Sequence, residues 1–180
     1  MSFSIAPPVL LVDGYNIIGA WSELKSLRDR DLEAARDRLV DTLINYTASK
    51  GYQTQVVFDA HFQTTPKFRE TPTSDLSVYY TAYGETADTY IEKFCATNSR
   101  QGKVAQQRLI VATSDRAQQL TVSGYGAEWL SAQQLANDVR GAKRKTKNKQ
   151  RSRQKSQGRF LMNALDPKAQ KQLSKLRHGL

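Results

Sequence analysis

The 180-residue sequence is poor in the residues that build disulfides and zinc sites. It holds one cysteine, Cys95, and two histidines, His61 and His178. A single cysteine excludes an internal disulfide framework, and so few ligands argue against a zinc-histidine enzyme. No apolar run approaches the roughly 20 residues of a membrane-spanning helix, and the first run, Val9–Val12, follows a segment too short and too polar for a secretory signal. We therefore expect a cytoplasmic protein without a membrane partner.

Acidic residues are scarce in one part of the chain. The whole sequence has 27 Lys and Arg against 17 Asp and Glu, a net charge of +10. Residues 141–180 contain 13 of these cations and a single acid, Asp166, whereas residues 1–140 carry a net charge of −2. Positive charge confined to the last quarter of the chain indicates a segment that binds a polyanion. We expect residues 1–140 to form one globular domain and residues 141–180 to form a basic extension.

Short apolar runs alternate with amphipathic segments along residues 1–140. The spacing predicts helices at 31–50, from Thr86 for about three turns, after Asp115 as far as Val122, and from Ser131 through Val139, with a loop around Trp21. The expected strands are residues 9–12, 55–58, 78–83, 108–113 and 127–130. Because the connections are long enough for crossovers, we expect an α/β fold of three layers, with a mainly parallel, Rossmann-like sheet flanked by helices.

Residues 143–159 cannot contribute to a core, because they include no acid and no aliphatic side chain. This tract is either a solvated helix that continues the preceding one or a disordered arm. Its nine cations are expected to contact RNA phosphates without reading base sequence. The alternative is a charged helix that only aids solubility. The candidate RNA-binding residues are Lys143, Arg144, Lys145, Lys147, Lys149, Arg151, Arg153, Lys155 and Arg159.

Acidic residues also follow the expected strands at the point where each strand ends. Asp13, Asp59 and Asp115 lie within two residues of a strand's carboxyl end, and Glu85 and Asp88 open an expected helix. Because the carboxyl ends of parallel strands meet at one edge of a sheet, we expect these carboxylates to converge. A cation or a proton stabilises such a cluster, and oxygen ligands favour Mg²⁺ or Mn²⁺. For each residue taken singly, the alternative is a helix cap or a turn.

Four segments carry these acids in order. They are Leu10–Trp21 (LLVDGYNIIGAW), Val57–His61 (VFDAH), Glu85–Glu92 (ETADTYIE) and Val111–Asp115 (VATSD). Together they resemble the successive motifs of the YacP-like NYN-domain ribonucleases, which are relatives of the PIN-domain nucleases. The resemblance covers roughly residues 9–140, and a basic carboxy-terminal extension is usual in that family. It implies a PIN-like fold and a metal-dependent endoribonuclease that acts on messenger RNA in association with the ribosome.

The resemblance also implies roles for single residues. Asp13 and Asp88 match the principal catalytic acids, and Asp59 and Asp115 match supporting members of the acidic site. Asn16 matches the polar residue of the first motif, with an inferred role in positioning a ligand or the metal-bound water. The metal supplies a water of lowered pKa and stabilises developing charge when an RNA phosphodiester is hydrolysed. The expected metal ligands are Asp13, Asp88, Asp115 and Glu85.

Two other classes of protein share these features. A non-catalytic RNA-binding or ribosome-associated factor has the same tail and fold, and a DNA-directed nuclease has the same acidic site, because both polymers present phosphates. Aromatic side chains are a further candidate contact, since unpaired bases stack on them. The aromatic candidates are Tyr15, Trp21, Tyr79, Tyr80 and Tyr83, for which the alternative is a place in the core or the sheet.

Overall fold

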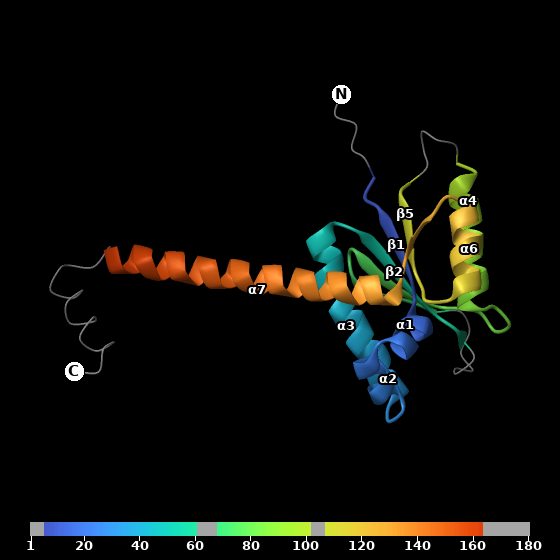
Figure 1. Ribbon diagram of the computed structural model, residues 1–180, viewed down its shortest axis with the longest axis horizontal. Coiled ribbons are helices and arrows are strands. Elements are labelled where there is room, and N and C mark those ends of the chain that lie inside the picture. The colour runs from blue at the N-terminus through green and yellow to red at the C-terminus, as the bar shows by residue number, and fades with distance from the viewer. Residues whose placement is uncertain (1–5, 61–67, 102–106, 164–180) are drawn as a thin grey trace. The chain divides into compact units, whose positions relative to one another are not determined.

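The computed structural model describes residues 6–60, 68–101 and 107–163 (Figure 1). The chain divides into two compact units, Met1–Ala142 and Lys143–Leu180. The first unit holds a six-stranded sheet with helices on both faces. Within the described ranges, no helix is both long enough and apolar enough to cross a membrane.

Five strands of the sheet run parallel, and an edge strand, β3, runs antiparallel to its neighbour. The order across the sheet is β3-β4-β2-β1-β5-β6. The strands are β1 (Val9–Asp13), β2 (Gln53–Phe58), β3 (Phe68–Thr73), β4 (Leu76–Tyr80), β5 (Leu109–Ala112) and β6 (Glu128–Leu130). This confirms the predicted α/β fold, a mainly parallel sheet flanked by helices.

Strand β1 lies at the centre of the sheet because its side chains are apolar on both faces. Val12 pairs with Val56 of β2 on one side and with Ala112 of β5 on the other. All three residues are fully buried, as a central parallel strand covered by helices requires. The next residue, Asp13, therefore stands in the middle of the sheet's carboxyl edge.

One face of the sheet is covered by α1 (Gly14–Ala20), α2 (Ser22–Arg28), α3 (Leu32–Lys50) and the first turns of α7 (Ala132–Asn163). The buried residues of this core come from every one of these elements. Helix α3 begins at Asp31, whose side chain accepts the Ala34 N–H at 2.9 Å, and ends at Gly51 in a left-handed conformation. These are the ordinary start and stop signals of an amphipathic helix.

The opposite face is covered by α4 (Ala87–Ser99) and α6 (Arg116–Gly124), which lie across the sheet from α3 (Figure 1). Its core includes Leu11, Val57 and Val111 from the sheet. Ile91 of α4 and Val122 of α6 pack against them and are fully buried. Both helices begin at the carboxyl edge of the sheet, since α4 follows the end of β4 and α6 follows the end of β5. Their first turns therefore lie beside Asp13.

Four elements differ from the sequence-based prediction, namely α1, α2, β3 and β4. A loop was expected where α1 and α2 form, because α1 is short and holds two glycines, which gives it a weak helix propensity. Burial of Ile17 and Ile18 in the core stabilises the helix in spite of this propensity. No strand was expected at residues 68–73, where the exposed edge strand β3 contains Pro72. The next strand was expected at 78–83, whereas β4 spans Leu76–Tyr80. Tyr83 lies beyond the sheet and is 96% exposed.

Helix α7 starts with a reciprocal cap and continues through the basic tract. The Ser131 hydroxyl accepts the Gln134 N–H at 3.1 Å, and the Gln134 side chain accepts the Ser131 N–H at 3.0 Å. Leu135 is fully buried in the first unit. From Lys143 the helix belongs to the second unit, and of the two alternatives for residues 143–159 the structure has the helix.

Candidate active site

Asp13 joins the central strand to the first helix. It is the last residue of β1 and the N-cap of α1, where its carboxylate accepts the Asn16 N–H at 3.2 Å. The helix starts at Gly14, and a Cβ atom at that position would collide with the Phe58 ring. Glycine therefore lets the chain turn from strand to helix directly after Asp13. The Asp13 side chain is held in place and only 7% exposed.

Asp59 connects the end of β2 to the beginning of α4. Its carboxylate accepts the backbone N–H of Ala87, the first residue of α4. The hydroxyl of Thr86 accepts the Thr89 N–H at 3.1 Å and completes the cap. Asp59 thereby holds the first turn of α4 at the carboxyl edge of the sheet, and this turn carries Asp88.

Asp115 caps the other helix of this face. Its carboxylate accepts the N–H groups of Ala117 at 2.7 Å and Gln118 at 3.0 Å. The preceding residue, Ser114, donates its N–H to the side-chain oxygen of Asn16 at 2.6 Å. The Asn16 side chain therefore joins the first motif to the backbone of the loop that carries Asp115, and so helps to position Asp115.

Gln118 is a site residue that the sequence analysis missed. Its side-chain amide donates to the Asp88 carboxylate at 2.5 Å, while its backbone N–H bonds Asp115. The residue is 6% exposed, and its side-chain oxygen, also buried, has no hydrogen-bond partner within the described part of the chain. The spacing from Asp115 to Gln118 is that of a capping box and predicts a bond back to the Asp115 N–H, but that N–H donates to the Thr113 hydroxyl at 3.0 Å, so the sequence carried no signal for the bond to Asp88.

The four aspartates interact electrostatically. The pKa of Asp13 is raised from its ordinary value of 3.8 to about 7, mainly because the carboxyl is buried. The negative charges of Asp88, Asp59 and Asp115 raise it further, while the Asn16 N–H opposes the shift. Burial also raises the pKa of Asp88, as do the charges of Asp115 and Asp59, and the Gln118 amide opposes it. The structure thus brings together Asp13, Asp59, Asp88 and Asp115.

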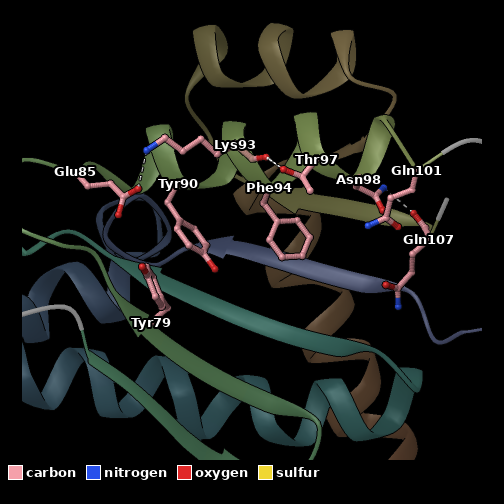
Figure 2. A pocket seen from close by; sticks show the side chains of 9 residues that line it. All are labelled: Tyr79, Glu85, Tyr90, Lys93, Phe94, Thr97, Asn98, Gln101 and Gln107. Atoms are coloured by element: carbon pink, nitrogen blue, oxygen red, sulfur yellow. Dashed lines mark hydrogen bonds and ion pairs between the residues drawn. The ribbon is translucent and has the colours of Figure 1, made fainter. Parts of the chain in front are cut away.

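Glu85 is engaged elsewhere. Its carboxylate pairs with the Lys93 ammonium at 3.1 Å, and both residues line a pocket on the side of α4 that faces Tyr79 of β4 (Figure 2). The carboxylates that raise the pKa of Asp13 are Asp88, Asp59 and Asp115. Among the predicted metal ligands, Glu85 is therefore the one that the structure does not bring to the cluster.

The donor chemistry of the cluster suits a hard divalent cation. Its members are carboxylates, and the raised pKa values of Asp13 and Asp88 reflect repulsion and desolvation that a bound cation would relieve. In the described ranges, no group of three Asp, Glu, His or Cys side chains is already arranged to enclose a metal ion. Asp13, Asp59 and Asp115 each use a carboxylate oxygen to accept an N–H group at the start of a helix. The residues therefore fit a cation in kind, although three of the four carboxylates also cap helices.

The remaining predicted residues have other surroundings. Lys143, Arg144, Lys145, Lys147, Lys149 and Arg151 lie on α7 and are exposed, and Arg153, Lys155 and Arg159 belong to the same helix. His61 lies outside the described residues. Four of the five aromatic candidates take part in packing or hydrogen bonds, and Tyr83 is exposed. The packed ones are Tyr15 on Phe58, Tyr80 on Phe58, Tyr79 on Tyr90, and Trp21, whose indole N–H donates to the Ala132 carbonyl.

Fold and site together define an α/β protein with a carboxylate-lined site at the carboxyl edge of a parallel sheet. Within that class, the chain belongs to the YacP-like NYN domain family, whose model matches residues 10–178. NYN domains form part of the PIN-like nucleases, so the chain has a nuclease-family domain.

Relatives cover almost the whole chain. It is 36% identical over 173 residues to the uncharacterized protein YacP of Bacillus subtilis (strain 168), covering 95% of this chain and 97% of that protein. Two crystal structures of Rae1 (YacP) from Bacillus subtilis, one of a point mutant, are similar as well. The mutant has a TM-score of 0.67, 31% identity and coverage of 93% of this chain and 99% of that one. The other has a TM-score of 0.67, 33% identity and 95% coverage of both chains.

Proposed function

We propose that the protein is a metal-dependent endoribonuclease that hydrolyses RNA phosphodiester bonds, with messenger RNA in association with the ribosome as its substrate. The observation that supports this most is the gathering of four aspartates at the carboxyl edge of the sheet, where Asp59 bonds the start of α4 and Gln118 joins Asp88 to the helix that Asp115 caps. Burial and the three neighbouring carboxylates raise the pKa of Asp13 to about 7. A group of acids that destabilise one another's charge is the usual mark of a site built for a cation or a proton. Membership of a nuclease family supports the same conclusion.

Asp13, Asp88 and Asp115 are the residues that would hold Mg²⁺ or Mn²⁺, and the bound ion would lower the pKa of a water and offset charge on the phosphate oxygens. Glu85 enters this set only if its ion pair with Lys93 opens. Asp59 and Asn16 act as positioning residues, because they fix the start of α4 and the loop before α6. Gln118 is proposed to hold the Asp88 carboxylate in the direction of the cluster.

The first turns of α4 and α6 meet at the cluster as well. Their N-termini carry partial positive charge, which favours an anionic phosphate beside the carboxylates. Since Asp59 and Asp115 each bond one of these N-termini, the carboxylates and the helix ends stand at a fixed distance from each other. Because Asp59 and Asp115 already accept N–H groups of these first turns, the helix ends act on a phosphate through their dipoles and not as direct donors.

Residues 141–180 are proposed to hold the RNA, while residues 1–140 form the nuclease domain. The nuclease part carries a net charge of −2 and by itself repels a polyanion, whereas residues 141–180 carry +12. Deleting residues 143–180 should therefore weaken RNA or ribosome binding greatly and leave the fold of the first unit unchanged. The first effect is measured by filter binding and the second by circular dichroism. Unchanged affinity contradicts the role of the tail.

The central test compares Asp13→Asn and Asp88→Asn with the unmodified protein in Mg²⁺. Each variant keeps the side-chain size and removes one charge from the cluster. Both should remain folded and lose RNA cleavage by a factor on the order of 100 or more. Asp41→Asn is the matched control, because Asp41 is an exposed acid on α3. Full cleavage by either folded cluster variant overturns the assignment.

A non-catalytic RNA- or ribosome-binding factor is the second candidate function. It is favoured by one observation: in the described part of the chain, no three potential ligands already enclose a metal ion. Titration calorimetry with Mg²⁺ or Mn²⁺ separates the two, because the nuclease should show a saturable heat of metal binding, of either sign, and Asp88→Asn should not. A side-by-side assay with matched DNA strands tests the remaining alternative, a DNA-directed nuclease.

A further inference from the structure

A pocket of about 400 Å³ runs along α4 (Figure 2). Three aromatic rings stand in its middle: Tyr79 from β4, and Tyr90 and Phe94 from α4. Tyr79 and Tyr90 are stacked with ring centroids 4.2 Å apart, and the Tyr90 hydroxyl donates to Gln55 at 3.2 Å. These contacts hold the two tyrosine rings in place, whereas Phe94 packs against the same core and remains partly buried. The pocket thus offers an apolar, aromatic surface to a flat ligand.

One end of the pocket lies beside the start of α4, the helix start that Asp59 bonds. Glu85 lines that end, two residues before Ala87, whose N–H is bonded by Asp59. It pairs there with Lys93, so the charges of these two lining residues cancel. The pocket therefore has no net positive charge from this pair that would bind an anion. A neutral group is the better match, and it can be attached to a phosphate that lies at the cluster.

The other end carries amide side chains. Asn98 is buried and donates to the Gln107 carbonyl at 2.9 Å, which fixes the wall of the pocket. The exposed Gln101 side chain lies beside it (Figure 2). An amide presents a donor and an acceptor together, which is the pattern that the edge of a nucleobase matches. Rings in the middle and an amide at the end suit a flat, uncharged, polar-edged ligand.

We propose that this pocket binds an unpaired base of the RNA strand whose phosphodiester lies at the aspartate cluster. Phe94 supplies the stacking face, and Gln101 contacts the base edge. The proposal rests on the proposed ribonuclease function, and it adds a base subsite beside the cleavage site. Stacking of a base on one aromatic ring changes affinity by about tenfold. Removing the base at one position near the cut should therefore weaken binding more than removing a base elsewhere in the strand.

The test uses the full-length chain with Asp88→Asn, so that RNA is bound without being cut. The probe is a short single-stranded RNA in which 2-aminopurine replaces one base, position by position along the strand. Stacking should quench the fluorescence at one position. Adding Phe94→Leu keeps an apolar side chain and removes the ring; it should abolish that quenching and weaken RNA binding about tenfold. Phe94→Tyr should restore both.

An abasic nucleotide at the quenched position gives a second arm. It should weaken binding to the chain with Phe94 by the same factor and have no further effect on the Phe94→Leu chain. Equal quenching and equal affinity for the chain with Phe94 and for the Phe94→Leu chain overturn the base subsite. RNA binding without quenching at any one position overturns it as well, and so does a failure to bind RNA. If position-specific quenching is seen but the unmodified protein cuts no RNA in Mg²⁺, the subsite stands and the proposed ribonuclease function fails.

Discussion

Replacing Asp13 with asparagine should make the protein more stable at neutral pH while it removes a proposed metal ligand. The Asp13 carboxyl has a pKa of about 7 in the folded chain, against an ordinary value of 3.8. Each pH unit between these values corresponds to about 1.4 kcal/mol, so ionised Asp13 costs the folded state up to about 4 kcal/mol above pH 7. Asparagine has no charge to bury and still accepts the cap hydrogen bond from Asn16.

The sign of the pH dependence follows from proton binding. Between pH 4 and pH 7 the unfolded chain has released the Asp13 proton, whereas the folded chain keeps it. The free energy of unfolding of the unmodified protein should therefore fall as pH rises through this window and level off above it. Asp13→Asn lacks this fall, so its advantage grows from a small value near pH 4 to as much as about 4 kcal/mol at pH 8.

The assay is urea unfolding at pH 5 and pH 8 with a chelator present. Tryptophan fluorescence reports it, because the indole N–H groups of Trp21 and Trp129 bond backbone carbonyls of the folded unit. Mg²⁺ should stabilise the unmodified protein at pH 8 and stabilise Asp13→Asn less. Asp41→Asn should be no more stable than the unmodified protein at pH 8, and Mg²⁺ should stabilise it to the same extent. The reasoning is refuted if Asp13→Asn is no more stable than the unmodified protein at pH 8.

Three further predictions concern the supports of the site and its substrate. Gln118→Leu keeps the side-chain volume but removes the amide that lowers the pKa of Asp88, so NMR titration should find that pKa higher; an unchanged pKa rules out this role for Gln118. Gly14→Ala places a Cβ against Phe58 and should cost about 1–3 kcal/mol, read as a lower melting temperature than that of Gly124→Ala, which meets open space. RNA affinity should fall steeply with salt, and a shallow slope argues against binding by the tail.

The position of the aspartates could be predicted because buried parallel strands are short apolar runs. Val9–Val12 and Gln55–Phe58 stand out from their surroundings, and the residue after each is an acid. Once these strands are parallel, their carboxyl ends must share an edge, which brought Asp13 and Asp59 to one site. The fold class and the gathering of four aspartates therefore follow from local pattern and chain topology.

Contacts between elements could not be predicted in the same way. The bond from Gln118 to Asp88 joins α6 to α4, and the pair of Glu85 with Lys93 takes an expected ligand away from the cluster. Both depend on where side chains turn after the helices have packed. Helix α1 was missed for a related reason, because burial of Ile17 in the core stabilises a segment whose own propensity is weak.

Cleavage of a defined RNA tests the central claim most directly. Unmodified protein and Asp88→Asn are incubated with the RNA and Mg²⁺, with and without ribosomes, and the products are separated by size. The unmodified protein should cut the RNA, more efficiently when ribosomes are present, and Asp88→Asn should be inactive under both conditions. Equal cleavage by the two proteins, or no cleavage by the unmodified protein under either condition, contradicts a metal-dependent ribonuclease centred on the aspartate cluster.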